Sequence, residues 1–238
     1  MKATHENSNQ TYRKTAVLVG VLYILGTVTG VLSVIFTQPV TNATEYLTAI
    51  LANQNQVTLG ALFILAMGLS LAWVAILLFP VLKKFNEALA IGYVVFRGTL
   101  ETVTYLAMVV CMLLLPSFAK AYAGAPGASN FQSLAESLLQ VHATANLMLI
   151  IVFCLGALIL YSALYASKLI PRWLSVWGIL AILLHLSTAF LDMFGLMDAS
   201  VSGTTFILNF PIFSQEMVMA VWLIAKGFNP SAIVTEQA

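Results

Sequence analysis

The sequence predicts an all-α fold, a polytopic membrane helical bundle of six transmembrane helices. Of the 238 residues, 61% are hydrophobic and only 8% are charged, whereas a soluble domain has about 25% charged residues. Each of six mostly apolar runs is long enough to cross the ~30 Å hydrocarbon core of a bilayer as a helix. The runs are residues 16–36, 57–82, 89–115, 133–167, 171–194 and 206–225.

Positive charge is distributed unevenly between the loops that these six helices would leave. Eight of the ten Lys and Arg residues fall in the N-terminal segment, the two tight turns and the C-terminal end, all on one side. Arg97 lies within a run, and Lys120 alone falls on the opposite side. Because Lys and Arg are enriched in cytoplasmic loops, we expect both termini to be cytoplasmic.

The segments outside the runs are short. Residues 1–12 are polar and predict a disordered tail, residues 13–229 form the six-helix transmembrane domain, and residues 230–238 form a C-terminal tail. Between the first two runs, Asn42–Glu45 fits a capping box and apolar residues follow at helical spacing up to Leu51. This pattern predicts one short amphipathic helix at the outer interface.

Composition also limits the partners. The net charge is +1, which argues against a nucleic-acid partner, and the apolar surface makes membrane lipids the expected surroundings. A small ligand and a second copy of the chain are further candidate partners. The two cysteines, Cys111 and Cys154, lie inside apolar runs and are best interpreted as buried hydrophobic residues.

The run 89–115 carries the main candidate site. Tyr93, Arg97, Glu101 and Tyr105 recur at intervals of four and so form one polar stripe on a helix. A charged side chain at mid-membrane costs at least ~2.5–3.5 kcal/mol, so it needs a partner. Arg before Glu is the weaker order for a pair on an isolated helix, which suggests that Arg97 has another partner elsewhere.

Glu216 is the best candidate for that partner. It lies ten residues before Lys226, and Arg97 lies thirteen residues after Lys84, which places both near mid-membrane. One cation facing two carboxylates leaves one negative charge, so we expect one carboxyl to hold a proton. His185, also near mid-depth, completes this candidate polar core cluster, which is either a ligand or ion site or a structural lock between helices.

A second, outer-side polar site is predicted from His142, Asn146 and Asp192. His142 and Asn146 share a face of the fourth run, and Asp192 follows His185 on a face of the fifth. A zinc site from His142, His185 and Asp192 is conceivable, but no His-x-x-x-His or Glu-x-x-His spacing supports it. We therefore predict no metal and no other cofactor.

Four stretches resemble the membrane-protein family labelled domain of unknown function 4386 (DUF4386). They are YRKTAVLVGVLY (12–23), FPVLKKFNEALAIGY (79–93, with Arg97 and Glu101 following), LIPRWLSVWG (169–178) and QEMVMAVWLIAKGFNP (215–230). The resemblance covers almost the whole chain and implies a bacterial inner-membrane protein. It implies no activity and no catalytic residues.

Three functional hypotheses follow from the residues. The first is a non-enzymatic protein that binds or moves a small ligand through a polar pocket in the bundle; the break expected at Pro211 supports it, because transporters use discontinuous helices. The second is an intramembrane enzyme acting on a lipid or isoprenoid, with Glu216 or His185 as acid or base. The third is a structural or regulatory membrane subunit. Neither a Gly-x-Ser-x-Gly motif nor a phosphate-binding loop is present, so the evidence leans away from an enzyme.

Overall fold

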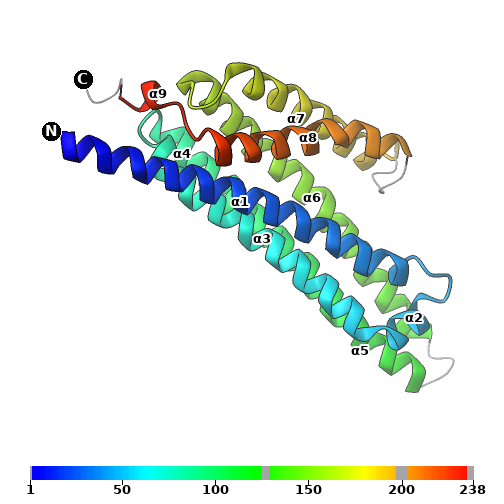
Figure 1. Ribbon diagram of the computed structural model, residues 1–238. Coiled ribbons are helices and arrows are strands. Elements are labelled where there is room, and N and C mark those ends of the chain that lie inside the picture. The colour runs from blue at the N-terminus through cyan, green and yellow to red at the C-terminus, as the bar shows by residue number, and fades with distance from the viewer. Residues whose placement is uncertain (1, 125–128, 197–202, 235–238) are drawn as a thin grey trace. The chain divides into compact units, whose positions relative to one another are not determined.

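The computed structural model describes residues 2–124, 129–196 and 203–234, which are predominantly helical and contain no strand (Figure 1). The helices are α1 (Lys2–Thr41), α2 (Tyr46–Ala52), α3 (Gln54–Leu82), α4 (Glu87–Tyr93), the π-helix η1 (Val94–Leu100), α5 (Glu101–Gly124), α6 (Ser129–Ser167), α7 (Arg172–Met193), α8 (Gly203–Ala225) and α9 (Pro230–Val234).

Six helical spans in these ranges are long and apolar enough to cross a membrane, which confirms the predicted fold class. One of them, Glu87–Gly124, is a single continuous span built from α4, η1 and α5. The other five spans lie in α1, α3, α6, α7 and α8.

The chain divides into two compact units. Unit 1 contains the described residues of Met1–Ile24, Ser70–Glu101 and Ile150–Ala238, and unit 2 contains those of Leu25–Leu69 and Thr102–Leu149. Helices α1, α3 and α6 contribute a segment to each unit, and the long span Glu87–Gly124 is divided between the units after Glu101. We describe each unit separately.

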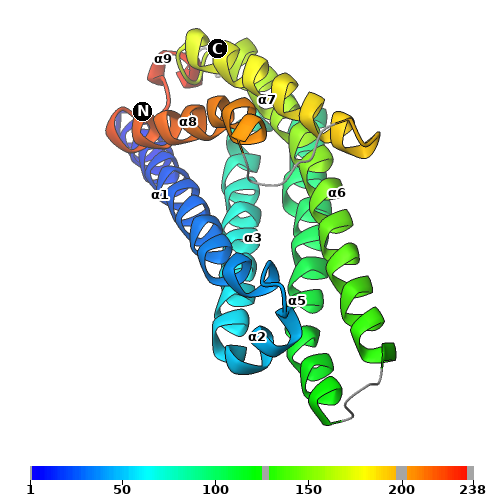
Figure 2. The same cartoon turned by 90° about the vertical axis from the view of Figure 1, so that its right-hand side faces the viewer.

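Unit 1 has a core of large apolar and aromatic side chains. Helices α7 and α8 run side by side in it (Figures 1 and 2), and α1 packs closely on α8, where a Cβ added to Gly20 would lie 2.6 Å from the carbonyl oxygen of Ala220. Tyr161 is fully buried and lies against Gly178 of α7. The small residues therefore allow the close helix contacts that packing in a membrane requires.

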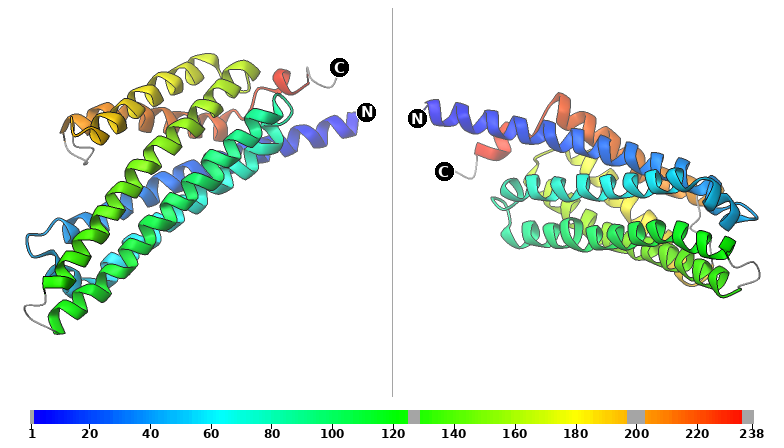
Figure 3. Two further views of the ribbon diagram at one scale, coloured as in Figure 1. Left: turned by 180° about the vertical axis from the view of Figure 1, so that it is seen from behind. Right: turned by 90° about the horizontal axis from the view of Figure 1, so that it is seen from below.

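Unit 2 contains α2 and the segments of α1, α3, α5 and α6 assigned to it, and Figure 3 shows the α3 and α5 segments running alongside one another. The predicted amphipathic helix is present as α2, and its Leu47 and Ile50 are buried. The Tyr46 hydroxyl donates to the carbonyl of Gln132 at 3.3 Å. Burial raises the pKa of Tyr46, with a further contribution from the Glu136 carboxylate, so the hydroxyl stays protonated as a donor.

Several helix ends differ from those predicted. Helix α1 begins at Lys2, so the tail predicted for residues 1–12 is helical from residue 2, because no Gly or Pro interrupts it and an existing helix extends without a new nucleus. Helix α9 likewise starts at Pro230, within the predicted C-terminal tail, because proline suits a first helical position. Helix α2 begins after Glu45, which makes no side-chain cap hydrogen bond, so the capping box at Asn42 is wrong.

Two prolines lie inside helices, namely Pro116, directly before which a predicted run ends, and Pro211, where a break was expected. Helix α5 continues through Pro116 to Gly124, and α8 runs from Gly203 to Ala225 with Pro211 inside it. Prolines are tolerated in membrane helices because neighbouring groups can satisfy the freed carbonyls. Residues 125–128 and 197–202, which connect predicted runs, lie outside the described residues.

Candidate functional site

The candidate site of unit 1 is built around Arg97, which lies in the π-helix η1. The helix leading to it starts at Asn86, whose side chain accepts a hydrogen bond from the backbone N–H of Leu89 and so caps α4. In η1 the backbone hydrogen bonds reach five residues rather than four, an arrangement that occurs in short stretches and frequently at functional sites.

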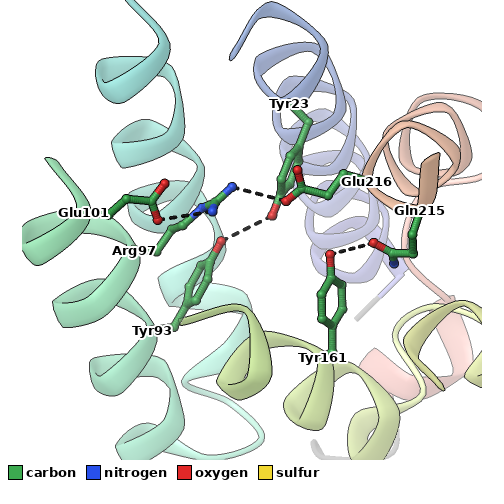
Figure 4. A network of polar contacts seen from close by, with 7 residues as sticks. All are labelled: Tyr23, Tyr93, Arg97, Glu101, Tyr161, Gln215 and Glu216. Atoms are coloured by element: carbon green, nitrogen blue, oxygen red, sulfur yellow. Dashed lines mark hydrogen bonds and ion pairs between the residues drawn. The ribbon is translucent and has the colours of Figure 1, made fainter. Parts of the chain in front are cut away.

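Arg97 lies between two carboxylates, and we call this arrangement of Arg97, Glu101 and Glu216 the fork (Figure 4). Its Nη1 donates to Glu101 Oε2 at 3.2 Å, and its Nη2 donates to Glu216 Oε1 at 3.3 Å. Glu101 is on the next turn of the same span, whereas Glu216 comes from α8. The contact predicted between Arg97 and Glu216 is therefore present, and it joins two segments 119 residues apart in the sequence.

Aromatic rings face the Arg97 guanidinium. Its central carbon lies 4.6 Å from the ring centroid of Phe153 and 5.7 Å from that of Tyr23. The Tyr23 and Tyr93 hydroxyls are 3.4 Å apart, and Figure 4 shows this pair next to the fork of carboxylates. Aromatic faces attract a cation, so these rings stabilise the guanidinium in a site with little water.

A second buried polar contact lies beside the fork in sequence and in space. The Tyr161 hydroxyl donates to Gln215 Oε1 at 2.6 Å (Figure 4). Gln215 Nε2 donates to the carbonyl of Leu174 at 3.1 Å. Gln215 is fully buried and precedes Glu216 directly. The two hydrogen bonds join α6, α7 and α8 and fix the turn of α8 that carries Glu216.

Tight packing closes the site. A Cβ added to Gly156 of α6 would lie 3.3 Å from the backbone nitrogen of Arg97 and 3.2 Å from Phe96 Cβ. The exposed fraction of the side chain is 2% for Arg97 and 1% for Glu101, but 16% for Glu216. Glu216 is therefore the most accessible member of the charged fork.

The charges of the fork do not cancel. One guanidinium faces two carboxylates, so the three side chains carry one net negative charge when both carboxyls are ionised. The Nε of Arg97 is buried and has no hydrogen-bond partner among the described residues. A buried charge separated from its partner is costly, by about 3–5 kcal/mol, so the fork is an energetically sensitive part of unit 1.

His185 belongs to unit 1 but makes other contacts. Its Nδ1 lies 2.6 Å from Asn209 Oδ1, so Nδ1 carries the proton and donates, given that an amide oxygen only accepts. Thr188 also donates to this oxygen, at 3.3 Å. The His185 ring meets the Phe153 ring edge to face, with centroids 5.8 Å apart, so Phe153 contacts both His185 and Arg97.

The remaining predicted residues are divided between the units. Tyr105 belongs to unit 2, where its ring packs against Gly68, so it is not assigned to the Arg97 cluster. His142 and Asn146 also belong to unit 2, whereas Asp192 belongs to unit 1. The buried Nε2 of His142 has no hydrogen-bond partner in the described part of the chain. Within the same part, no group of three His, Cys, Asp or Glu side chains could hold a metal ion.

Four aromatic or amide residues of the site were missed by sequence reasoning: Tyr23, Phe153, Tyr161 and Gln215. Gln215 carried a usable signal, because an amide inside an apolar run needs a partner in the membrane. Tyr23 lies in the middle of its run rather than near an interface, where Tyr is enriched, and this position was a weaker signal. Phe153 and the π-helix had no signal, since both depend on tertiary packing.

The comparisons with known proteins agree with the predicted resemblance. A family model described as Domain of unknown function (DUF4386) matches residues 18–227 of the 238-residue chain. Neither a curated protein nor a solved structure matches the chain. The match assigns no activity to the cluster, so a function has to be argued from the side chains themselves.

Proposed function

The chain belongs to the DUF4386 family of membrane proteins, and we propose that it binds a proton as its small ligand at the cluster of Arg97, Glu101 and Glu216. The observation that carries the proposal is the fork in which one buried guanidinium contacts two carboxylates at 3.2 and 3.3 Å. Two carboxylates that share a site favour the uptake of a proton, since both cannot easily be ionised there.

The packing of the site favours a proton over a larger ligand. Two cavities of unit 1, of about 480 and 10 Å³, are lined by described residues, and the three side chains of the fork line neither of them. The smaller cavity touches Tyr23 but is no larger than about one water molecule. A proton needs only an oxygen lone pair, whereas an organic ligand needs space.

Glu216 is the residue at which the proton exchanges in this proposal. It is the most exposed of the three side chains, at 16%. Glu101, at 1%, remains paired with Arg97, which keeps its charge at all relevant pH values. Protonation of Glu216 weakens its ion pair with Arg97, and this pair connects α8 to η1, so proton binding is linked to the contact between these helices.

Infrared spectroscopy tests the proposal. A protonated carboxyl has a carbonyl-stretch band that an ionised one lacks, and exposed carboxylates are ionised at neutral pH. We expect purified protein in uncharged detergent to show this band at neutral pH, and we expect Glu216→Gln to remove it. Glu87→Gln is the matched control, because Glu87 is 60% exposed and paired with Lys83.

Several results of this infrared experiment would contradict the proposal. If wild-type protein has no protonated carboxyl at neutral pH, or if the band survives in both Glu216→Gln and Glu101→Gln, the cluster does not bind a proton. A band lost equally in Glu87→Gln would also contradict the proposal, because that carboxylate lies outside the fork.

A structural lock is the second candidate function, favoured by the low exposure of Arg97 and Glu101 and by the tight contact with Gly156. The two candidates differ in one measurable respect. A lock keeps both carboxyls in one protonation state over the pH range in which the protein is folded, whereas a proton-binding site changes state within that range.

The proposal includes an orientation, with both termini in the cytoplasm of a bacterial cell and the protein in the inner membrane. Support comes from the eight of ten Lys and Arg residues that the six spans leave on one side, together with the positive-inside rule. A reporter fused after Ala238 should report a cytoplasmic location, and one inserted between α5 and α6 an external one. The reverse pattern would refute the orientation without affecting the proton site.

A further inference from the structure

A cavity of about 480 Å³ lies at one end of unit 1, away from the lining of the Arg97 fork. It is formed by two turns, the one between α6 and α7 and the one that leads from α8 to α9 (Figure 1). The cavity lies at the ends of three helices that are long and apolar enough to cross a membrane, two that end at Ser167 and Ala225 and one that begins at Arg172. Its volume is within the range of ordinary small-molecule sites, about 300–1,000 Å³.

The two turns are held together by Asn229. Its backbone N–H donates to the carbonyl of Leu169 at 2.8 Å, and its Nδ2 donates to the carbonyl of Lys168 at 3.3 Å. Lys168 has a φ of +58°, a left-handed conformation that a residue other than glycine rarely adopts. These bonds fix the turn in that conformation and hold the Lys168 backbone at the cavity wall.

The lining is cationic. Lys168, Arg172 and Lys226 all line the cavity, and none of the described lining residues is acidic. The guanidinium of Arg172 lies over the Tyr165 ring, 5.0 Å from its centroid, which holds the charge in place without neutralising it. Three cations with no acidic residue in the described lining make a site for a negatively charged group.

A fourth cation, Arg13, compensates the partial negative charge at the carboxyl end of α8. Arg13 Nη1 donates to the carbonyl of Leu223 at 3.0 Å, and Nη2 donates to that of Ile224 at 2.6 Å. The carboxyl end of a helix carries a partial negative charge, and a bound cation compensates it. The end of α8 therefore does not offset the three cations of the cavity.

The rest of the lining is apolar. Trp222 is half-buried and Ile170 and Phe228 are buried, whereas the three charged side chains are exposed. A cationic rim over an apolar floor at the end of membrane spans matches a ligand with a phosphate group at the water boundary. The phosphate would meet the three cations, and any attached carbon groups would meet Trp222.

We propose that this cavity, which we call the phosphate pocket, binds an anionic phosphate group through Lys168, Arg172 and Lys226. The phosphate belongs either to the headgroup of an anionic lipid or to a small soluble molecule. The pocket is separate from the proton site of the preceding section, and neither proposal depends on the other.

Isothermal titration of the purified full-length protein in uncharged detergent tests the proposal. The probes are inorganic phosphate, short-chain phosphatidylglycerol and, as a zwitterionic comparison, short-chain phosphatidylcholine, all at one ionic strength. A cation near an anionic headgroup contributes roughly a fivefold gain in affinity, so the triple variant Lys168→Gln/Arg172→Gln/Lys226→Gln should raise the Kd on the order of a hundredfold. The matched control is Lys14→Gln/Lys83→Gln/Lys84→Gln, which removes the same charge elsewhere in unit 1.

Binding of phosphatidylglycerol alone assigns the pocket to a lipid headgroup, and binding of inorganic phosphate as well shows that the phosphate group suffices; both support the proposal. The proposal is overturned if neither inorganic phosphate nor phosphatidylglycerol binds. It is also overturned if phosphatidylcholine binds as tightly as phosphatidylglycerol, or if the two triple variants lose affinity equally. Should the triple variant fail to fold, Lys226→Gln against Lys14→Gln gives the same comparison with an expected difference of about fivefold.

Discussion

The two units differ in the hydrogen bonds that several of their buried polar side chains make. In unit 1, buried Arg97 and Gln215 make hydrogen bonds to other helices, and the partners are 119, 54 and 41 residues away in the sequence. In unit 2, the buried Thr29, Ser33 and Thr37 donate to carbonyls of their own helix, three or four residues earlier. A polar side chain of a membrane bundle can therefore join two helices through a hydrogen bond, or it can form a hydrogen bond only within its own helix.

This difference indicates where function and tertiary stability are concentrated. A hydroxyl that donates to its own helix can be lost without leaving a buried group unpaired, because the carbonyl keeps its backbone donor. A side chain that bonds to another helix leaves its partner unsatisfied when it is removed, at a cost of about 1–3 kcal/mol or more if charged. Unit 2 has cross-helix bonds of its own from Gln56 and Tyr46, but these two side chains are only partly buried.

The largest expected effect is that of Arg97→Ala. Its removal leaves Glu101 without its cation and Glu216 without its hydrogen-bond donor, which should lower the free energy of unfolding by about 3–5 kcal/mol in detergent. Glu101→Gln and Glu216→Gln should each cost much less, because Arg97 then keeps one partner. Arg97→Lys should recover little, since an ammonium group cannot fork between two carboxylates. Thermal unfolding of the four variants measures this order, and equal losses for all of them would contradict the fork.

A smaller loss in the free energy of unfolding is expected for Tyr161→Phe. It removes the 2.6 Å hydrogen bond to Gln215 Oε1 and leaves this fully buried oxygen without that donor, a cost of about 1–3 kcal/mol. Tyr165→Phe is the control, because Tyr165 is 40% exposed and its ring can still lie under Arg172. If both changes have the same small effect on thermal unfolding, the Tyr161 contact does not hold α6 to α8.

Gly156→Ala should lower the free energy of unfolding by about 1 kcal/mol. The added methyl group would lie 3.3 Å from the Arg97 backbone nitrogen, a strain of about 1–3 kcal/mol that the better helix propensity of alanine partly offsets. Gly98→Ala, in η1 itself, meets nothing closer than 3.4 Å and should be neutral or stabilising. The two melting temperatures test this difference, and the reverse order would show that α6 does not press on the site.

The smallest effect is expected in unit 2. Thr37→Val keeps the shape of the side chain and removes only the hydrogen bond to the carbonyl of Ser33, so it should change the free energy of unfolding by less than about 1 kcal/mol. The same holds for Ser33→Ala, whose hydroxyl donates to the carbonyl of Gly30. A loss comparable with that of Tyr161→Phe, measured by the same thermal unfolding, would remove the contrast between the units.

The spans could be predicted because hydropathy adds up over twenty or more residues, and so could the Arg97–Glu101 pair, which follows from helix periodicity. Glu216 could be found from its depth alone, since a charge at mid-membrane needs a partner. The helix ends could not, because Pro116 and the polar residues before Tyr12 continue their helices through packing and propagation. The π-helix around Arg97 also depends on packing, and no local pattern marks it.

The most direct test of the account is a double-mutant cycle on Arg97 and Glu216, measured by unfolding in detergent with Arg97→Gln, Glu216→Gln and the double variant. The 3.3 Å contact predicts a coupling free energy between the two sites of about 1–3 kcal/mol, so that the double variant is more stable than the sum of the single losses implies. The pair Thr37 and Glu216, taken from different units, is the control and should be additive within about 0.5 kcal/mol. Additive losses at Arg97 and Glu216 would show that the two side chains do not interact and would contradict the account.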